Sequence, residues 1–286
     1  MELLSPSASR WRRRRGRLAE ALCAVAAAIG VGALLAIFGY VAIQGIGALD
    51  LAFFTAMPAP VGETGGGVAN AIAGTLLIVA IAAVIAVPVG VGAGTYLAEF
   101  GAGRFAHVVR LLTDVLTGVP SIVIGILAYE LVVVKMERFS ALAGGVALAA
   151  LMLPPIVRAT EEILRLTPRE YTEAALALGA PRWRTIATVV YPAAAGGLLT
   201  GVMLALARAA GETAPLLFTA FGNTFWNLDP LQPTAALPLQ IYQYAISPYD
   251  DWHRQAWGAA LVLVTLVFAL SALARFATRR HAPVRG

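Results

Sequence analysis

Six long runs of apolar residues, separated by short polar segments, organise the chain. The runs cover about residues 18–43, 70–98, 108–134, 140–157, 192–220 and 255–275. A helix needs roughly 20 mostly apolar residues to cross the hydrocarbon core of a bilayer. The pattern therefore predicts an all-α membrane protein with six transmembrane helices.

Prolines should disturb two of these helices, because proline lacks the N–H donor of a helical turn and clashes with the preceding carbonyl. The fourth run is the shortest and ends at Pro154 and Pro155, so we expect this span to be kinked or partly irregular. In the third run, Pro120 should kink the helix. The first run follows a basic segment, as in a signal peptide, but its apolar part is too long for one, and we expect a span.

The composition supports a membrane domain. Of the 286 residues, 59% are hydrophobic and only 13% are charged, whereas a soluble domain needs far more charge to cover its surface. The formal net charge is +5. The arginines cluster at the ends of apolar runs, which indicates membrane orientation and argues against nucleic-acid binding. The single cysteine, Cys23, lies within an apolar run and is expected to be a small packing residue.

The basic residues also predict the orientation of the spans. Four segments carry most of them: Arg10, Arg12–Arg15 and Arg17; Arg104 and Arg110; Arg158, Arg165, Arg169, Arg182 and Arg184; and Arg275, Arg279, Arg280 and Arg285. Because basic residues concentrate in cytoplasmic segments, both termini are predicted to be cytoplasmic. The chain then divides into a basic segment 1–17, a transmembrane domain 18–280 and a cytoplasmic tail 281–286.

A polar helical hairpin, about residues 158–191, falls on the predicted cytoplasmic side. Its Thr167-Pro168-Arg169-Glu170 sequence fits a capping box, and Gly179 suits a left-handed C-cap. These signals predict a helix over 168–178, followed by a second helix that Pro181 opens. An amphipathic helix on the membrane surface is one interpretation. The small side chains of Ala174, Ala175 and Ala177 favour docking into a partner's groove instead. The docking surface is expected to comprise Glu173, Ala174, Ala175, Leu178 and Gly179, mainly because this stretch resembles a known coupling loop.

One charged pair is predicted to lie inside the membrane. Arg208 lies 16 residues after Pro192, or roughly 24 Å along a helix, in a bilayer core about 30 Å thick. Glu212 follows at i+4, on nearly the same helix face. The pair could simply hold helices together, although an apolar pair would usually do so better. The functional interpretation is an anion site, because the guanidinium fork suits phosphate oxygens.

Other polar residues are weaker candidates. Asp114 fits either the substrate path or the inner membrane interface. Thr117 and Ser121 fit either the path or ordinary hydrogen bonding between helices. The last outer loop carries aromatic residues that predict an interfacial belt with a short helix near 236–246, and a protein contact there is no better supported: Phe225, Trp226, Tyr242, Tyr244, Tyr249 and Trp252.

Several stretches resemble those of a known family. Glu173-Ala-Ala, followed by Gly179 and by Val189-Val-Tyr-Pro192, resembles the coupling loop of ABC-importer permeases. The string Arg208-Ala-Ala-Gly-Glu-Thr-Ala-Pro215 resembles the fifth span of phosphate-importer permeases of the PstA type, as do residues 118–125 and 232–248. The resemblance covers about residues 65–275.

This resemblance implies the architecture of a type I ABC-importer permease and transport of inorganic phosphate across the inner membrane. It implies a role in the substrate path for Arg208 and Glu212, and Thr213 belongs to the same string. It also implies three partners: a second permease subunit (PstC-like), an ATPase dimer (PstB-like) that binds ATP with magnesium, and an extracytoplasmic phosphate-binding protein (PstS-like). No cofactor is expected in this chain.

Other chemistries lack their sequence signals. A Walker loop ends in Gly-Lys-Ser/Thr, and the only lysine, Lys135, follows Val134, so the chain is not expected to hydrolyse ATP. No histidine pair has metal-ligand spacing, and no constellation typical of an intramembrane enzyme is present. Two alternatives remain: a permease for another oxyanion, such as sulfate, molybdate or a phosphonate, and an ion-coupled transporter, which should show internal repeats that this sequence lacks.

Overall fold

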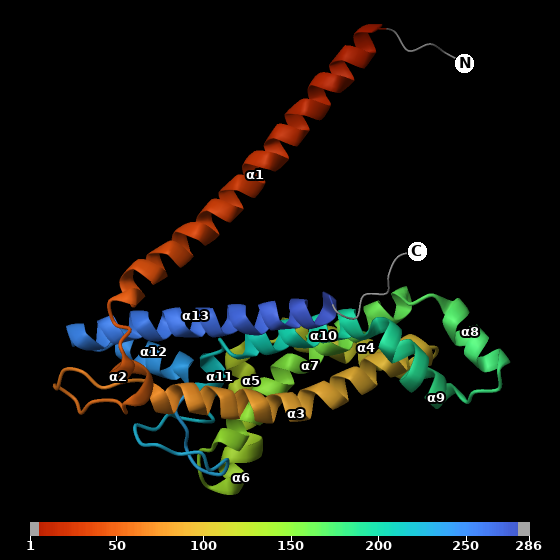
Figure 1. The fold of residues 1–286 in the computed structure, drawn as a ribbon. Helices are drawn as coiled ribbons and strands as arrows, with labels where there is room; N and C mark the ends of the chain where they lie inside the picture. The colour runs from red at the N-terminus through yellow and green to blue at the C-terminus, as the bar shows by residue number, and fades with distance from the viewer. Residues whose placement is uncertain (1–5, 280–286) are drawn as a thin grey trace.

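The computed structural model describes residues 6–279, and the predicted tail 281–286 lies outside them. The described part of the chain is helical and contains no β-strand. Its α-helices are α1 (Pro6–Ile46), α2 (Leu51–Thr55), α3 (Ala69–Glu99), α4 (Arg104–Gly118), α5 (Ser121–Ala128), α6 (Val134–Met136), α7 (Ala141–Leu166), α8 (Arg169–Ala177), α9 (Arg182–Thr185), α10 (Tyr191–Ala209), α11 (Ala214–Leu217), α12 (Leu237–Ala245) and α13 (Asp250–Arg279). Figure 1 shows most of them side by side in one elongated bundle.

The core of the bundle forms where α3 packs along α7 (Figure 1). Glycines on α3 permit this close approach. A Cβ atom on Gly94 would lie 2.5 Å from Cβ of Thr160, and one on Gly90 would lie 2.7 Å from Cγ2 of Ile156. Small residues let membrane helices gain packing energy where lipid supplies no hydrophobic drive. The α3–α7 pair is therefore the rigid part on which the other helices are placed.

Five described helical segments are long and apolar enough to cross a membrane, and a sharply bent pair brings the number to six. The bent pair joins Arg104–Gly118 to Ser121–Met136 at an angle of 106°. The bend lies at the predicted position, Pro120, but it is a break at Val119 and Pro120 and not a kink within one continuous helix over 108–134. A residue before proline is pushed into the extended region, and Val119 has ψ of 129°.

The fourth and fifth spans also differ from their predictions. Helix α7 continues through Pro154 and Pro155 to Leu166, so the expected irregularity is wrong, and packing against α3 and α10 holds the helix together. Helix α10 ends at Ala209, so a continuous helix over 192–220 is also wrong. The chain turns before Pro215, which cannot donate to a continuing helix and instead occupies the first turn of α11.

The hairpin α8–α9 projects from one end of the bundle (Figure 1). Gly179 has φ of +83°, its N–H donates to the Leu176 carbonyl, and that of Ala180 donates to the Ala175 carbonyl. This is a Schellman motif and confirms the predicted C-cap. The predicted capping box is wrong, because the Thr167 hydroxyl donates to the Ile163 carbonyl of α7 at 3.3 Å. Helix α7 runs to Leu166, so residues 158–166 of the predicted hairpin lie in this helix.

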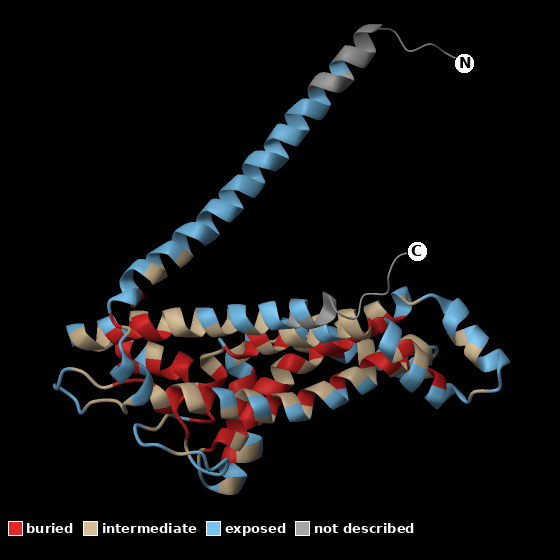
Figure 2. Ribbon diagram, in the orientation of Figure 1, coloured by how far each residue is buried: buried red, intermediate tan, exposed pale blue. Residues whose placement is uncertain are grey.

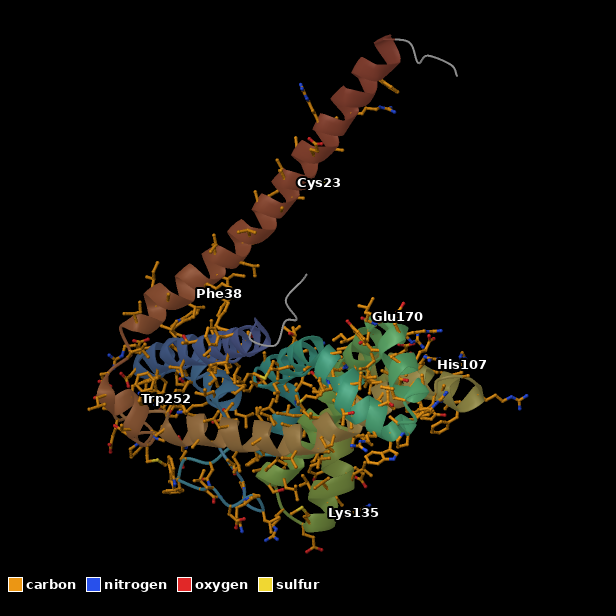
Figure 3. The ribbon with its side chains drawn as sticks, turned by 45° about the vertical axis from the view of Figure 1, so that its right-hand side comes forward. Cys23, Phe38, His107, Lys135, Glu170 and Trp252 are labelled. Carbon is orange, nitrogen blue, oxygen red and sulfur yellow. The ribbon has the colours of Figure 1, made fainter. Side chains whose placement is uncertain are left out.

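Helix α1 stands away from the bundle and is exposed along most of its length (Figure 2). It contacts α13 only near its C-terminal end, where Phe38 meets Phe268 with ring centroids 5.1 Å apart and Tyr40 meets Trp257 at 5.3 Å. Cys23 lies on the projecting part (Figure 3) and is exposed. The packing role predicted for it is therefore not fulfilled within this single chain.

The end opposite the hairpin carries α2, α12 and the first turn of α13. Glu170 on α8 and Trp252 on α13 lie at opposite ends of the molecule (Figure 3). Helix α12 confirms the short helix predicted near 236–246, but Leu237, Leu239 and Tyr244 are buried in the protein. Tyr244 stacks on Trp252 with ring centroids 4.5 Å apart. The helix thus belongs to the protein core at this end and is not only an interfacial element.

Candidate functional site

A cavity of about 380 Å³ lies between the α4–α5 break, helix α7 and the end of helix α10, and two arginines and a glutamate are among its lining residues. The break between α4 and α5 forms one wall, the proline pair of α7 a second, and the end of α10 a third. The lining residues are Leu116, Thr117, Val119, Pro120, Ser121, Leu151, Pro154, Pro155, Arg158, Arg208 and Glu212. Interrupted helices are tolerated within a membrane where they line such a cavity. We therefore take this cavity as the candidate site.

Arg208 reaches the cavity from the last turn of α10. The partial negative charge at a helix C-terminus favours a cation there. Its Nε lies 3.8 Å from Oε1 of Glu212, and the two side chains are 71% and 20% exposed. The helix ends before Glu212, so the carboxylate sits in the following turn and not on the helix face predicted for it. The loose contact leaves guanidinium donors available to an anion.

Arg158 is a second cavity cation, which the sequence analysis assigned to a cytoplasmic loop. It forms an ion pair with Asp114 that joins α7 to α4. Asp114 does not line the cavity itself but holds a residue that does. A signal was present in the sequence: once α7 is taken to continue past its prolines, Arg158 lies one turn after Pro154, on the same face.

The predicted hydroxyl residues are divided between the cavity and its surroundings. Thr117 and Ser121 line the cavity on either side of the break. The Thr117 hydroxyl donates to the Thr113 carbonyl within α4 at 2.8 Å, which leaves its oxygen free to accept. Thr213 is not among the lining residues. Its carbonyl accepts from Leu216 and Leu217 and so begins α11, which makes it a residue that shapes the wall.

A buried carboxylate near the hairpin end was missed by the sequence analysis. Glu161 is 3% exposed, and its Oε1 accepts from Arg110 Nε of α4 at 2.8 Å and pairs with Arg165 at 2.7 Å. Arg110 also donates to the carbonyls of Leu97 and Gly101 at the end of α3. In the sequence, Arg110 and Arg165 indicate only the orientation of the spans. The cluster ties α3, α4 and α7 together one turn after Arg158.

The hairpin presents a largely exposed surface. Helix α8 contains no buried residue. Glu173, Ala174, Leu178 and Gly179 are exposed and Ala175 is partly so. Leu178, at the helix end, is 89% exposed. The residues predicted to dock a partner are therefore accessible at the end of the bundle.

Comparison with known proteins gives consistent results. The family model "Binding-protein-dependent transport system inner membrane component" matches residues 86–283. The chain is 45% identical to "Phosphate transport system permease protein PstA" of Yersinia pestis, over 95% of this chain and 93% of the relative. The protein of the same name from Haemophilus influenzae is 45% identical over 93% and 94%. PstA 1 of Mycobacterium tuberculosis (strain ATCC 25618 / H37Rv) is 44% identical over 76% and 72%.

Solved structures agree at the level of the fold. An inward-facing conformation of the MetNI methionine ABC transporter aligns with a TM-score of 0.58 at 22% identity, covering 76% of this chain and 94% of that one. A second crystal form gives 0.59 at 21% identity, with the same coverage. The MetNI structures confirm the type I permease fold, and the 45% identity to two PstA proteins confirms the resemblance to PstA-type permeases. The chain belongs to the family of binding-protein-dependent transport system inner membrane components.

Proposed function

We propose that this chain is a permease subunit of an ATP-driven importer of inorganic phosphate. The observation that carries the proposal is one cavity that receives Arg158 and Arg208 from two different helices, in a chain similar over nearly its whole length to phosphate permeases. Planar guanidinium groups match the oxygens of a tetrahedral anion in charge and in hydrogen-bond geometry.

The charges around the cavity favour weak, reversible binding of an anion over tight binding. Each arginine has one carboxylate partner, Asp114 for Arg158 and Glu212 for Arg208, so the four groups together carry no formal net charge. Phosphate would take guanidinium donors from the carboxylates on entry and return them on leaving. Thr117 and Ser121 supply further hydrogen bonds. A permeant anion must be bound well enough to enter and weakly enough to leave.

The two cationic residues lie on the helices that lead into and out of the hairpin. Helix α7 carries Arg158 and ends at Leu166, just before the hairpin. The continuous segment from Arg182 to Ala209 leads from the hairpin to Arg208. A force applied to α8 therefore acts on both walls of the cavity. This supports docking of an ATPase through Glu173, Ala174, Ala175, Leu178 and Gly179, with the hairpin in the cytoplasm.

Three partners follow from this function. An ATPase dimer with ATP and magnesium would drive the hairpin, a second permease subunit would complete the pathway, and an extracytoplasmic binding protein would deliver phosphate. Arg208 is 71% exposed in the single chain, as expected for a residue that faces the path between two permease subunits. The names of the relatives favour phosphate over other oxyanions.

Transport by the reconstituted complex tests the proposal. The complex is placed in proteoliposomes with ATP inside and the phosphate-loaded binding protein outside. We expect ATP-dependent, saturable uptake of labelled phosphate that excess sulfate, molybdate or methylphosphonate does not reduce. Equal competition by one of these anions would assign the chain to that substrate instead. Uptake driven by an ion gradient without ATP would reject an ABC mechanism.

A further inference from the structure

The arginines of the cavity cannot distinguish one tetrahedral oxyanion from another. Arg158 and Arg208 line the cavity, and a guanidinium group carries five N–H donors and no acceptor. Phosphate, arsenate, sulfate and molybdate all present four oxygens at the corners of a tetrahedron, so the two arginines suit each of them. A choice among these anions must therefore come from the other polar groups that line the cavity.

Two of those groups are hydrogen-bond acceptors. The Glu212 carboxylate lines the cavity, and an ionised carboxylate can only accept. The Thr117 hydroxyl donates its hydrogen to the Thr113 carbonyl at 2.8 Å, so it offers a ligand only the lone pairs of its oxygen. Such acceptors repel an anion that has no hydrogen, and repulsion of this kind is a common source of specificity. They fit an anion that carries a hydrogen of its own.

The Glu212 carboxylate is only loosely engaged within the chain. Its ion pair with Nε of Arg208 spans 3.8 Å, which is beyond hydrogen-bond distance, and it accepts no hydrogen bond from the residues that the structure describes. By contrast, Asp114 is hydrogen-bonded to Arg158 and does not line the cavity. Among the described lining residues, Glu212 is therefore the carboxylate that a ligand can use.

The backbone that carries Glu212 is fixed on both sides. Its N–H donates to the Ala209 carbonyl at the end of α10, at 3.1 Å, and the Thr213 carbonyl accepts from two N–H groups of α11. Pro215 of α11 lies so close to α5 that a Cβ on Gly125 would be 2.6 Å from its Cα. A carboxylate on such a constrained turn is preorganised, so it loses little freedom when it binds a ligand.

We propose that Glu212 makes the cavity selective for oxyanions that still carry a proton, by accepting a hydrogen bond from the hydroxyl of the bound anion. The inference rests on the proposed function, which puts phosphate in this cavity, and it assigns a choice between anions to the permease itself. At neutral pH, phosphate and arsenate each keep at least one proton, whereas sulfate and molybdate keep none. Hydrogen bonds from O–H to a carboxylate are short and strong.

Arg208 and Glu212 act together in this selection. Hydrogen phosphate takes the guanidinium donors through its bare oxygens and gives its hydroxyl to Glu212. Sulfate takes the same donors but leaves two negative groups facing each other. A site that binds a substrate hydroxyl rejects an analogue without it by roughly 10⁴-fold or more. Because the Glu212 side chain is 20% exposed, we expect a smaller preference, of roughly 100-fold.

Protection of a cysteine in the cavity measures anion binding without the delivering protein. Leu151, which lines the cavity, is replaced by cysteine, and the exposed Cys23 is replaced by serine. The complex of both permease subunits and the ATPase is held at constant ionic strength, and the rate at which N-ethylmaleimide labels this chain is followed against the concentration of each anion. We expect phosphate and arsenate to halve the rate at similar concentrations, and sulfate to need roughly 100-fold more.

The variant Glu212→Gln tests the residue itself. The amide keeps the volume and can donate, so the sulfate concentration that halves labelling should fall about tenfold or more, toward that of phosphate. Asp114→Asn is the matched control, because it removes a carboxylate that does not line the cavity. It should strengthen the binding of both anions alike and leave their ratio unchanged. An unchanged ratio in Glu212→Gln, or equal changes of the ratio in both variants, would overturn the proposal.

The same measurement separates this inference from the proposed function. If phosphate gives no protection while Glu212 is intact, the proposed function and the inference are rejected together. If phosphate and sulfate protect equally, only the inference is rejected. Should Glu212→Gln fail to assemble, the double variant with Arg208→Gln, which has no unpaired charge at this site, is measured in its place. It should bind both anions weakly and equally, and a retained preference for phosphate would overturn the proposal.

Discussion

At the scale of single residues, the two cavity arginines differ in how firmly they are held. Arg158 is joined to Asp114 across two helices, whereas Arg208 makes only a 3.8 Å contact with Glu212 and is largely exposed. Arg208 is therefore the residue better placed to exchange its carboxylate for an incoming anion. Arg158 is better placed to hold the wall and to contribute donors once the anion has entered.

Arg208→Lys should separate the role of the fork from that of the charge. Lysine keeps the charge but loses the planar donor pair. The loss of one charge-assisted hydrogen bond, ~1.5–3 kcal/mol, corresponds to roughly a 10- to 100-fold fall in phosphate uptake at equal membrane abundance. Arg208→Gln alone leaves the Glu212 carboxylate without its cation, which should disturb assembly. The double variant Arg208→Gln with Glu212→Gln removes this unpaired charge, so the complex should assemble normally but still not transport phosphate. Near-normal uptake in the double variant would show that the pair is only structural.

Asp114→Asn should release Arg158 without removing it. The freed guanidinium should then hold phosphate more strongly, so the KM of uptake should fall and the maximal rate should fall with it. Arg158→Gln should lower the rate and raise KM, because a donor is lost. Initial uptake rates over a range of phosphate concentrations distinguish the two patterns. Identical kinetics in both variants would mean that the pair acts only as a tie between α4 and α7.

At the scale of elements, the hairpin depends on one backbone conformation. Gly179 has φ of +83°, and no atom would contact a Cβ built there. Gly179→Val therefore strains the backbone alone, by more than the ~1–2 kcal/mol of an ordinary side chain in this region. We expect the ATPase to dissociate or uptake to fall several-fold. Gly179→Asn is the control, since asparagine tolerates this conformation. Full ATPase retention with normal uptake in the valine variant would contradict docking through this turn.

The buried cluster at Glu161 predicts a difference between adjacent glutamates. Glu161 binds Arg110 and Arg165, whereas Glu162 is exposed. Glu161→Ala leaves Arg110 without its carboxylate. We expect a loss of about 2–3 kcal/mol, below the ~3–5 kcal/mol of a fully buried pair, because Arg165 is largely solvent-accessible. Thermal unfolding of the purified subunit in detergent measures this. Equal effects of Glu161→Ala and Glu162→Ala would show that the cluster does not stabilise this end.

At the scale of the whole molecule, the chain lacks what a complete transporter needs. Helix α1 is exposed over most of its apolar surface, Arg208 is 71% exposed beside the cavity, and the hairpin projects from the end of the bundle (Figure 1). In the proposed assembly, lipid covers α1, and partner subunits cover the cavity and the hairpin. The molecule is therefore best understood as one part of an assembly.

The isolated subunit should neither bind nor hydrolyse ATP. No Gly-Lys-Ser/Thr loop is present, and such a loop is what holds the phosphates. Nucleotide binding by the purified chain should match a blank, and phosphate release should begin only when the partner ATPase is added. Activity of the subunit alone that survives removal of contaminating ATPases would overturn this assignment.

Local sequence signals predicted the positions of helices and helix ends well where a single physical preference determines them. Apolar length placed both ends of α3 within one residue and the start of α13 within five, and Gly179 identified the end of α8. A left-handed C-cap needs only a glycine at the right spacing, and a span needs only enough apolar residues. The sequence motifs that begin at Glu173 and at Arg208 also indicated the family without structural information.

Only the tertiary structure decided where the spans break and which charges meet. Pro120 and Pro154 are both prolines within apolar runs, yet the chain turns by 106° beside the first and continues as a helix through the second. Proline removes the same hydrogen bond at both sites, so packing decides the result. Arg158 and Arg208 are 50 residues apart in the chain and line one cavity. The sequence by itself determined a membrane permease, because apolar length and family motifs are local properties, whereas contacts between distant helices determined the shape and the lining of the cavity that holds Arg158 and Arg208.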